Sequence, residues 1–366
     1  MNIVVFGLTI SSSWGNGHAT LWRGFAHACA ERGYRFTFFE RDTPYYAMNR
    51  DTYPQYGETV LYEDWEDVRN RAVRALSDAD VAIVSSYCPD GIAASTLVCD
   101  ASRAVSVFYD LDTPVTLANL ARGESTTYIG PRKLADFDLV LSFTGGPVIN
   151  ALRDQLGARR VAPLYGHVDP DQHRRTVRQP QYSSDFSYLG TYAADRQNAL
   201  NTFFVEAARV RAESKFVIAG AQYPLNFPWT DNIYFVRHLP PSEHSSFFSS
   251  SSLTLNITRA DMAANGWCPS GRLFEAAACE TPIVSDWFDG LDRFLTPGSE
   301  IFVVRTTEDA LAALDLDDAV KQRIGRAARD RILAEHTSAI RLSEFERLVS
   351  APRAAPAPRF AHAESV

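Results

Sequence analysis

Short apolar runs rich in β-branched and aromatic residues alternate with helical segments along most of the chain, in two separate series. The first series begins with NIVVFGL at residues 2–8 and ends with RRVAPLYG at residues 159–166. The second begins with FSYLGTY at residues 186–192 and ends with EIFVVRT at residues 300–306. Near-continuous apolar runs of this length favour parallel strands buried on both faces, joined by crossover helices. The sequence therefore predicts two α/β domains, each with a doubly wound parallel sheet.

A polar stretch, GHVDPDQHRRTVRQPQYSSD, separates the two series and carries two prolines, which is typical of a linker. We expect a first domain over residues 1–165, a linker over 166–180 and a second domain over 181–335. An amphipathic end follows and predicts a C-terminal helix over residues 336–350. The tail at 351–366 is rich in alanine and proline and is predicted to be disordered.

Composition and charge restrict the class of partner. The 366 residues carry a formal net charge of −8, which disfavours duplex nucleic acid or an anionic membrane as the main partner. No apolar run approaches the roughly 18 residues of a membrane span. The five cysteines are odd in number and widely spaced, without the spacing of a zinc site, and indicate reduced thiols in a cytoplasmic protein.

Open α/β sheets bind ligands beyond the carboxyl ends of their strands, so the loops at those ends are the candidate site. In SSSWGNGHAT, Gly15 and Gly17 allow a ligand to approach the backbone, and His18 begins the next helix, where it could reach a phosphate or an acceptor hydroxyl. The third glycine of the dinucleotide-binding fingerprint is absent. A tight turn with a helix-capping histidine is the alternative interpretation.

A second loop, FYDLDTPVT, ends another strand with Asp110 and Asp112. We expect Asp110 to face the cleft and Asp112 to cap the next segment through an Asx-type turn before Pro114. An Asp-x-Asp pair can bind a hard cation, but no second acidic cluster stands near to complete the coordination sphere. The sequence therefore predicts no metal site here.

In the second domain, strand ends place Gly190, Tyr192, Gln222, Asn256 and Arg259 at the same edge. Arginine suits a phosphate because its planar guanidinium group donates two hydrogen bonds at once. A surface salt bridge is the alternative for Arg259.

The stretch PSGRLFEAAACETPIVSDW, residues 269–287, predicts a helix that starts at Ser270 and Gly271. Arg272 falls in the first turn, where positive charge opposes the helix dipole and suggests an anionic ligand or an acidic neighbour. Glu275 lies among alanines, where a buried carboxylate requires hydrogen-bond donors such as the two hydroxyls of a ribose. The alternative is that Glu275 points to solvent.

With these residues assembled, FEAAACETPIVSDW resembles the donor-binding helix of GT-B glycosyltransferases. The wider pattern is similar to the spore-maturation CgeB-like branch of that group. Eight segments carry the resemblance in order: GLTISSSWGNGHAT, FFERDTPYYA, YDLDTPVTLA, YLGTYAADRQ, AGAQYP, RHLPPSEH, NITRADM and PSGRLFEAAACETPIVSDWFDGLDRF. The resemblance implies a GT-B fold, in which two Rossmann-like domains face each other across a cleft and the C-terminal helix crosses back to the first domain.

The same resemblance implies roles for individual residues. Glu275 would bind the ribose of a nucleotide-sugar, and Arg259 and Arg272 would neutralise its diphosphate. The remaining implied positions are Gly17 and His18, beside the diphosphate and transferred sugar, and His238 and Leu239, along the nucleobase.

Two positions depart from the family pattern. Glu280 stands where the family commonly has glycine, and Trp267 stands where retaining members often have another glutamate. The second departure leaves the stereochemical outcome and the identity of the sugar open.

The predicted function is transfer of a sugar from a nucleotide-diphosphate sugar to a hydroxyl acceptor, without metal or cofactor and with retention as the favoured outcome. His18 and Asp110 are the candidate catalytic groups if a side-chain base is needed. The acceptor is a protein, a glycan or a small natural product. Two alternatives stay open: a nucleotide-sugar epimerase on the same fold, and a non-catalytic structural or coat protein.

Overall fold

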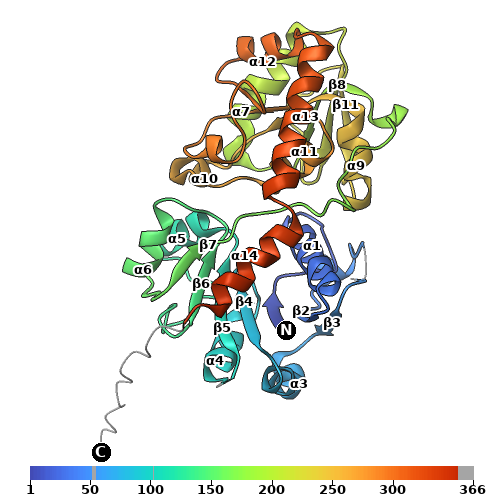
Figure 1. Ribbon diagram of the computed structural model, residues 1–366. Helices are drawn as coiled ribbons and strands as arrows, with labels where there is room; N and C mark the ends of the chain where they lie inside the picture. Colours follow the sequence, from blue (N-terminus) through green and yellow to red (C-terminus); the bar gives the residue numbers. More distant parts are fainter. Residues whose placement is uncertain (52–54, 102, 353–366) are drawn as a thin grey trace, which may run out of the picture.

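A computed structural model describes residues 1–51, 55–101 and 103–352 of the chain. It has two α/β lobes, each built around its own sheet, with the N-terminal lobe below the C-terminal lobe in Figure 1. The predicted disordered tail lies outside the described residues from residue 353 onward.

The N-terminal sheet has seven strands in the order β3-β2-β1-β4-β5-β6-β7, and all its pairs are parallel. Helices join the strands as crossovers, as the alternating sequence pattern predicts. The strands are β1 (Asn2–Gly7), β2 (Arg35–Arg41), β3 (Glu58–Tyr62), β4 (Val81–Ser85), β5 (Val105–Asp110), β6 (Leu139–Ser142) and β7 (Val161–Pro163). The helices are α1 (His18–Glu31), α2 (Pro44–Ala47), α3 (Trp65–Ser77), α4 (Gly91–Asp100), α5 (Thr113–Ala121) and α6 (Val148–Asp154).

The C-terminal sheet has six parallel strands in the order β10-β9-β8-β11-β12-β13. Its strands are β8 (Ser184–Leu189), β9 (Phe216–Gly220), β10 (Ile233–Arg237), β11 (Ser251–Asn256), β12 (Ile283–Ser285) and β13 (Phe302–Val303). Its helices are α7 (Gln197–Leu200), α8 (Glu206–Val210), α9 (Pro241–Ser250), α10 (Ala260–Asn265), α11 (Gly271–Ala278), α12 (Thr307–Leu314) and α13 (Asp318–Glu335). Short helical turns precede β8 (Pro180–Tyr182) and α7 (Ala194–Arg196), a π-helix (Asn201–Val205) joins α7 to α8, and a last turn (Leu291–Arg293) follows β12.

Both sheets reverse the direction of strand order at their first strand, because β1 lies between β2 and β4 and β8 lies between β9 and β11. Such reversals open the crevice in which α/β sheets bind ligands. The loops after β1 and β8 therefore stand at the edges where a ligand site is expected.

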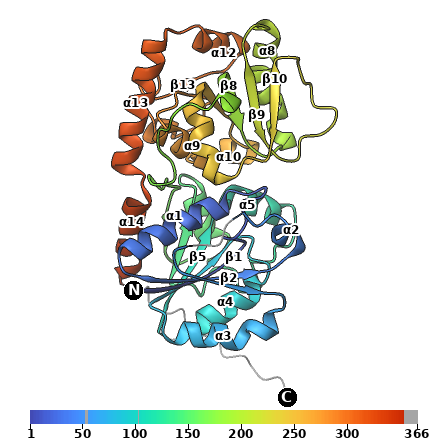
Figure 2. The ribbon, with the colours of Figure 1, turned by 90° about the vertical axis from the view of Figure 1, so that its right-hand side faces the viewer.

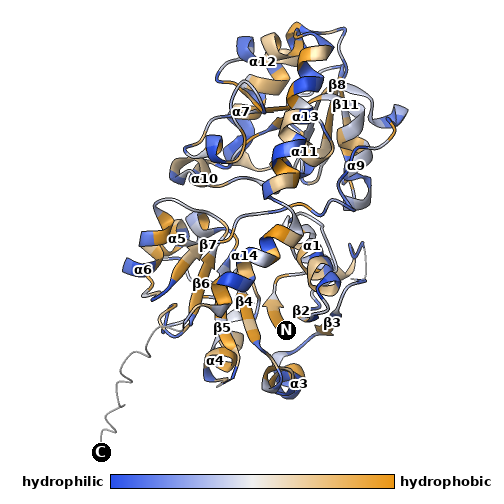
Figure 3. Ribbon diagram, viewed as in Figure 1, coloured by the Kyte–Doolittle hydropathy of each residue, from blue (hydrophilic) through white to orange (hydrophobic). Residues whose placement is uncertain are grey.

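The apolar runs of the sequence form the sheet interiors. Figure 3 shows the strands mainly in the hydrophobic colour and many outward helix surfaces in the hydrophilic one. The aromatic side chains of Phe6 and Phe108 in the first lobe, and of Phe186 and Phe216 in the second, are fully buried. Burial of such side chains is the main source of stability for both lobes.

The C-terminal helices run along one side of both lobes (Figure 2). Helix α13 packs against α11, and the chain then enters α14 (Ser338–Ser350), which packs against α1 of the first lobe. In that contact Tyr34 donates a hydrogen bond of 2.7 Å to Glu346, and Arg32 forms an ion pair with the same carboxylate at 3.2 Å.

The chain passes between the lobes twice, once in the linker and once between α13 and α14, and these two segments lie side by side. The backbone N–H of Val168, in the linker, donates to His336 O at 2.9 Å, and the N–H of Ser338 donates to Val168 O at 2.8 Å. The linker and the return crossing are therefore held together by a short bridge at the junction of the lobes.

Candidate active site

A cleft of about 560 Å³ lies between the lobes and is lined by residues from both. Most of the sequence-predicted site residues line it. They are Gly15, Gly17 and His18 from the first lobe, and Gly190, His238, Leu239, Arg259, Ser270, Gly271, Arg272 and Glu275 from the second. Four residues that the sequence predicted at the strand ends, Asp110, Tyr192, Gln222 and Asn256, do not belong to this lining.

The loop after β1 is anchored by one buried carboxylate, Glu40, at the end of β2. Its oxygens accept hydrogen bonds from Thr9 Oγ1 at 2.9 Å and Ile10 N at 2.7 Å. They also accept from Ser11 N at 3.0 Å and Ser11 Oγ at 2.6 Å. Both oxygens of Glu40 are thus occupied by the loop, which explains how a charge is accommodated there.

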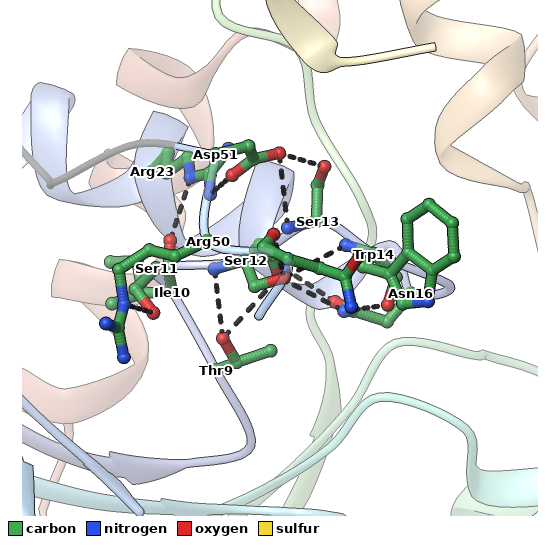
Figure 4. Close-up of polar contacts among 12 residues, drawn as sticks. Thr9, Ile10, Ser11, Ser12, Ser13, Trp14, Asn16, Arg23, Arg50 and Asp51 are labelled. Carbon is green, nitrogen blue, oxygen red and sulfur yellow. Dashed lines mark hydrogen bonds and ion pairs between the residues drawn. The ribbon is translucent and has the colours of Figure 1, made fainter. Parts of the chain in front are cut away.

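Figure 4 shows the continuation of this loop toward the cleft. Ser13 donates to the carboxylate of Asp51 through both its backbone N–H and its hydroxyl. Arg23 of α1 holds the other oxygen of Asp51 at 2.6 Å and also donates to Ile10 O at 2.8 Å. The loop is therefore preorganised by side chains of α1 and of the segment after α2.

The start of α1 is capped by Asn16 and not by His18. Asn16 Oδ1 accepts from the backbone N–H groups of His18 at 3.1 Å and Ala19 at 3.2 Å. Gly15 has a φ of +68°, which favours glycine, and a Cβ there would come within 2.9 Å of Tyr45 Oη. The side chain of His18 is consequently free of the capping role and belongs to the cleft lining.

The structure reverses the roles expected for Asp110 and Asp112. Asp110 is fully buried, and its Oδ1 accepts hydrogen bonds from Asp112 N and Thr116 Oγ1, each at 3.1 Å. Burial raises the pKa of Asp110 to about 6. Asp112 instead lines the cleft, with its carboxylate 3.3 Å from His18 Nε2, and makes no side-chain cap for α5. The prediction that Asp110 faces the cleft was wrong, because the strand end directs its carboxyl under the first turn of α5.

Three arginines of the second lobe line the cleft. Arg259 precedes α10; its side chain is 45% exposed and lies 3.5 Å from Asp195. Arg272 is held in place, because its Nε donates to Leu189 O, its Nη1 donates to Asn256 Oδ1 at 2.9 Å, and its guanidinium carbon lies 5.1 Å from the centre of the Tyr188 ring. The third, Arg196, donates to Thr191 O at 2.6 Å. Together with the N-terminus of α11 they make this wall suited to an anion.

The side chain of Glu275 on α11 is only 12% exposed and lines the cleft, so the alternative in which it points to bulk solvent was wrong. Its Oε2 lies 3.1 Å from His244 Nδ1, on α9, and 3.9 Å from His173 Nε2, in the linker. Burial alone would raise the pKa of Glu275, but the two histidines and Arg272 outweigh it and hold this pKa well below its usual value. No hydrogen bond within the described part of the chain reaches the second oxygen, Oε1, which leaves it available to a ligand.

At the far end of the cleft the two lobes touch through aromatic and polar side chains. The Trp14 ring lies 4.5 Å from the His238 ring between centroids, and His238 has a φ of +53°. Gln222 donates a hydrogen bond to Tyr45 Oη at 3.0 Å, so its side chain joins the two lobes. The sequence had predicted that Gln222 binds the nucleotide-sugar. Tyr192 packs against Tyr223 at 5.7 Å between ring centroids.

Trp267, which stands where retaining members of the family often have a glutamate, forms another contact between the lobes. Its backbone carbonyl accepts from Gly145 N at 3.0 Å, and its indole is so close that a Cβ on Gly146 or Gly290 would approach it within 2.5 Å. Trp267 lies outside the cleft lining. Its ring therefore fills a packing space between two glycines.

Sequence reasoning missed several residues of this site. Arg196 lies in YLGTYAADRQ and His244 in RHLPPSEH, two segments of the resemblance in which neither of these two residues was given a role. His173 was assigned only to the linker. The alternation of strands and helices could not locate them, because their approach to the cleft depends on tertiary packing.

Residues 196–347 match the family model described as "Glycosyl transferase-like". No curated protein is similar enough in sequence to match the chain.

Solved structures resemble the chain over nearly its full length. An alpha-glucosyltransferase in complex with UDP and a 13-mer DNA has a TM-score of 0.69 at 13% identity, with 96% of this chain and 99% of that chain covered. A sucrose-phosphate synthase from Thermosynechococcus elongatus has a TM-score of 0.67 at 13% identity, with 94% and 98% covered. The Anabaena protein HepE, in complex with UDP and glucose, has a TM-score of 0.63 at 11% identity, with 96% and 100% covered. The fold expected from the sequence is confirmed: the chain has the GT-B fold of two α/β lobes, and its residues 196–347 are similar to the glycosyl transferase-like family model.

Proposed function

We propose that this protein is a glycosyltransferase that moves a sugar from a nucleotide-diphosphate sugar, with UDP as the favoured nucleotide, to a hydroxyl acceptor. The observation that carries the proposal is the wall of the cleft, where a buried carboxylate with one unoccupied oxygen stands beside arginines. A ribose supplies two hydroxyl donors for Glu275, and a diphosphate supplies the anion for the arginines. Similar folds hold UDP in the alpha-glucosyltransferase and HepE complexes.

The donor is proposed to lie along the second lobe. Glu275 binds the ribose, Arg259 and Arg272 face the diphosphate with the N-terminus of α11, and the segment at His238 and Leu239 borders the nucleobase. Arg259 is the adaptable member, because its side chain is partly exposed and its contact with Asp195 is long. Positive charge and free N–H groups stabilise a departing diphosphate, so the reaction proceeds without a divalent cation or other cofactor in this proposal.

Retention of configuration is part of the proposal. Nε2 of His18 faces Asp112, and its Nδ1 is buried and has no hydrogen-bond partner in the described ranges. Neither nitrogen is therefore open to an incoming hydroxyl. Asp110 is buried below the cleft and cannot serve either. In a front-face reaction the departing phosphate takes the proton of the acceptor, which removes the need for a side-chain base. Asp112, whose carboxylate lines the cleft and is contacted by His18 Nε2, then positions the transferred sugar.

The acceptor is proposed to be a hydroxyl of a protein, a glycan or a small natural product. The net charge of −8 disfavours DNA, which is bound by one of the similar structures. No helix among the described residues is long and apolar enough to cross a membrane. We place the protein in the cytoplasm, where its five free thiols would stay reduced, and in the CgeB-like branch that its sequence resembles.

The test is binding of UDP, dTDP, GDP, ADP and CDP by thermal unfolding, followed by turnover of the matching nucleotide-sugars. A diphosphate at 100 times its dissociation constant stabilises the native state by about 2.7 kcal/mol. We expect a shift with UDP, with or without Mg²⁺, that is reduced in Arg259→Gln. The matched control is Arg209→Gln, since Arg209 forms an exposed pair with Glu206 on the outside of the lobe.

The anomeric configuration of the product, measured by NMR, decides between retention and inversion. An inverted product would refute the proposed front-face reaction. Absence of a shift with every diphosphate would refute the donor site and favour the structural-protein alternative.

A further inference from the structure

A cluster of three potential metal ligands lies where the linker meets two helices of the second lobe. The three residues are His173 in the linker, His244 on α9 and Glu275 on α11. One nitrogen of each histidine and one oxygen of Glu275 all lie within 4.8 Å of one another. The three side chains therefore converge on a single point from three separate segments.

His173 provides an independent indication of a ligand at this point. The residue is only 2% exposed, and neither ring nitrogen has a hydrogen-bond partner among the residues that the structure describes. Buried polar groups are nearly always paired, so an unpaired imidazole calls for an occupant. Its Nε2 is directed at Glu275, with 3.9 Å between this nitrogen and Oε2.

The spacing of the ligand atoms fits a bound ion. With metal–ligand bonds of about 2.1 Å, neighbouring ligands of a tetrahedral site stand roughly 3.4 Å apart. The distances from Glu275 Oε2 are 3.1 Å to His244 Nδ1 and 3.9 Å to His173 Nε2, one on each side of that value. Small side-chain rotations would therefore complete the geometry.

The chemistry of the three ligands selects the type of ion. Two imidazoles and one carboxylate suit Zn²⁺ and similar first-row transition metals, whereas Mg²⁺ and Ca²⁺ prefer all-oxygen sites. Three protein ligands leave one coordination position for water or another ligand, as in open zinc sites. His244 and Glu275 line the main cleft, and His173 lines a neighbouring cavity of about 180 Å³, so the ion has a path of entry.

We propose that His173, His244 and Glu275 form a binding site for Zn²⁺ or a similar transition-metal ion. The ion fastens the interdomain linker to α9 and α11. It shares Glu275 with any ligand in the cleft, although the metal site itself does not depend on the proposed glycosyl transfer.

A second group in the molecule, His27 with Asp169 and Asp171, has similar residue types and serves as the control. His27 Nδ1 already contacts Asp169 at 2.8 Å, and the side chain of Asp171 is 67% exposed. This second group contains no unpaired buried nitrogen, and we assign it no ion.

The experiment is a titration of the metal-free full chain with Zn²⁺, read by calorimetry and by competition with a chromophoric chelator. We expect one equivalent to bind to the wild type and to His27→Gln. Binding should weaken more than about 100-fold in His173→Gln and in His244→Gln, because loss of an outer partner alone typically costs 10- to 100-fold. Circular dichroism and thermal unfolding of each variant verify that it is folded.

Substitution with Co²⁺ provides a readout that needs no variant. A four- or five-coordinate site with two imidazoles gives visible absorption bands and a histidine signature in X-ray absorption, which a non-specifically bound ion lacks. The proposal is overturned if the wild type binds no stoichiometric Zn²⁺, if bound Co²⁺ shows no histidine ligation, or if affinity is lost only in His27→Gln.

Discussion

Two buried glutamates, one in each lobe, stand near the cleft and have opposite surroundings. Glu40, at the end of β2, accepts four hydrogen bonds from the loop after β1, two on each oxygen. Glu275, on α11, contacts histidines through Oε2 only and presents Oε1 at the cleft. Both are charged groups in protected positions, but only the second has unused hydrogen-bonding capacity.

This difference indicates that Glu40 supports the structure of a loop, whereas Glu275 belongs to a ligand-binding site. A carboxylate saturated by backbone and hydroxyl donors fixes the loop that carries Gly15 and Gly17, and it has nothing left for a ligand. A carboxylate that is half satisfied and open to a cleft is stable only because cationic or polarised neighbours support it, and it remains able to accept donors from outside. Burial alone would not have distinguished the two.

The largest expected effect comes from removing the saturated carboxylate. Glu40→Ala leaves four donors of the loop without their acceptor, and we expect the free energy of unfolding to fall by about 4 kcal/mol in chemical denaturation. The control is Glu58→Ala on the neighbouring strand, since Glu58 forms an exposed pair with Arg71 and should change stability by less than about 0.5 kcal/mol. Equal losses in the two variants would contradict the scaffold role.

Asp110 sharpens the comparison as a third buried carboxylate, with one oxygen bonded and the other, Oδ2, unpaired among the described residues. Burial raises its pKa from 3.8 to about 6. The folded state thus binds this proton more tightly than the unfolded state, and the stabilisation is present below pH 3.8 and lost as pH rises through about 6. We expect Asp110→Asn to be more stable than the wild type by roughly 3 kcal/mol at pH 8, with the difference vanishing near pH 4. A difference that does not vary with pH would disprove this assignment.

Substitution of the half-satisfied carboxylate should affect binding more than folding. Glu275→Gln keeps the shape of the side chain and an acceptor for His244, but it loses the charge that strengthens hydrogen bonds from ribose. We expect UDP to bind roughly 10- to 100-fold more weakly by calorimetry, about 2 kcal/mol. Glu280→Gln, two residues past the end of α11 and outside the cleft lining, is the matched control and should bind UDP normally. Parallel losses in both variants would point to distortion of α11 rather than to ribose binding.

The smallest effect is expected at Glu280, which has a φ of +60° and forms an ion pair with Arg175 of the linker. A left-handed backbone favours glycine, so Glu280→Gly should raise the free energy of unfolding by about 1 kcal/mol. Glu280→Ala keeps the unfavourable φ and removes the ion pair, and it should lower stability by a few tenths of a kcal/mol. Thermal unfolding measures both variants. If the melting temperatures of Glu280→Gly and Glu280→Ala shift in the same direction, the proposed backbone strain at Glu280 is refuted.

Much of the fold follows from local patterns. The apolar runs appear as strands of the two sheets, whereas the edge strand β3 was not among the predicted runs. The helix expected after Gly17 begins at His18, and the two sheets are parallel, as continuous apolar runs favour. These features depend on neighbours in sequence, such as the period of apolar residues and the position of glycine. The position of ligand sites at the carboxyl ends of α/β strands predicted the edge at which Arg259 lies, and the helix start predicted Arg272 and Glu275. The family resemblance added their roles toward a nucleotide-sugar.

The sequence by itself determined the two-lobed α/β architecture and the type of chemistry at the strand ends, because burial periodicity and turn residues act over short distances. Only the tertiary structure decided which of Asp110 and Asp112 faces the cleft, since strand-end geometry and the packing of α5 direct each carboxyl group. It also decided that His173, about 100 residues from Glu275, meets the same oxygen as His244. Such contacts join segments remote in sequence, and no local pattern encodes which side chains a folded chain brings within 4 Å of each other.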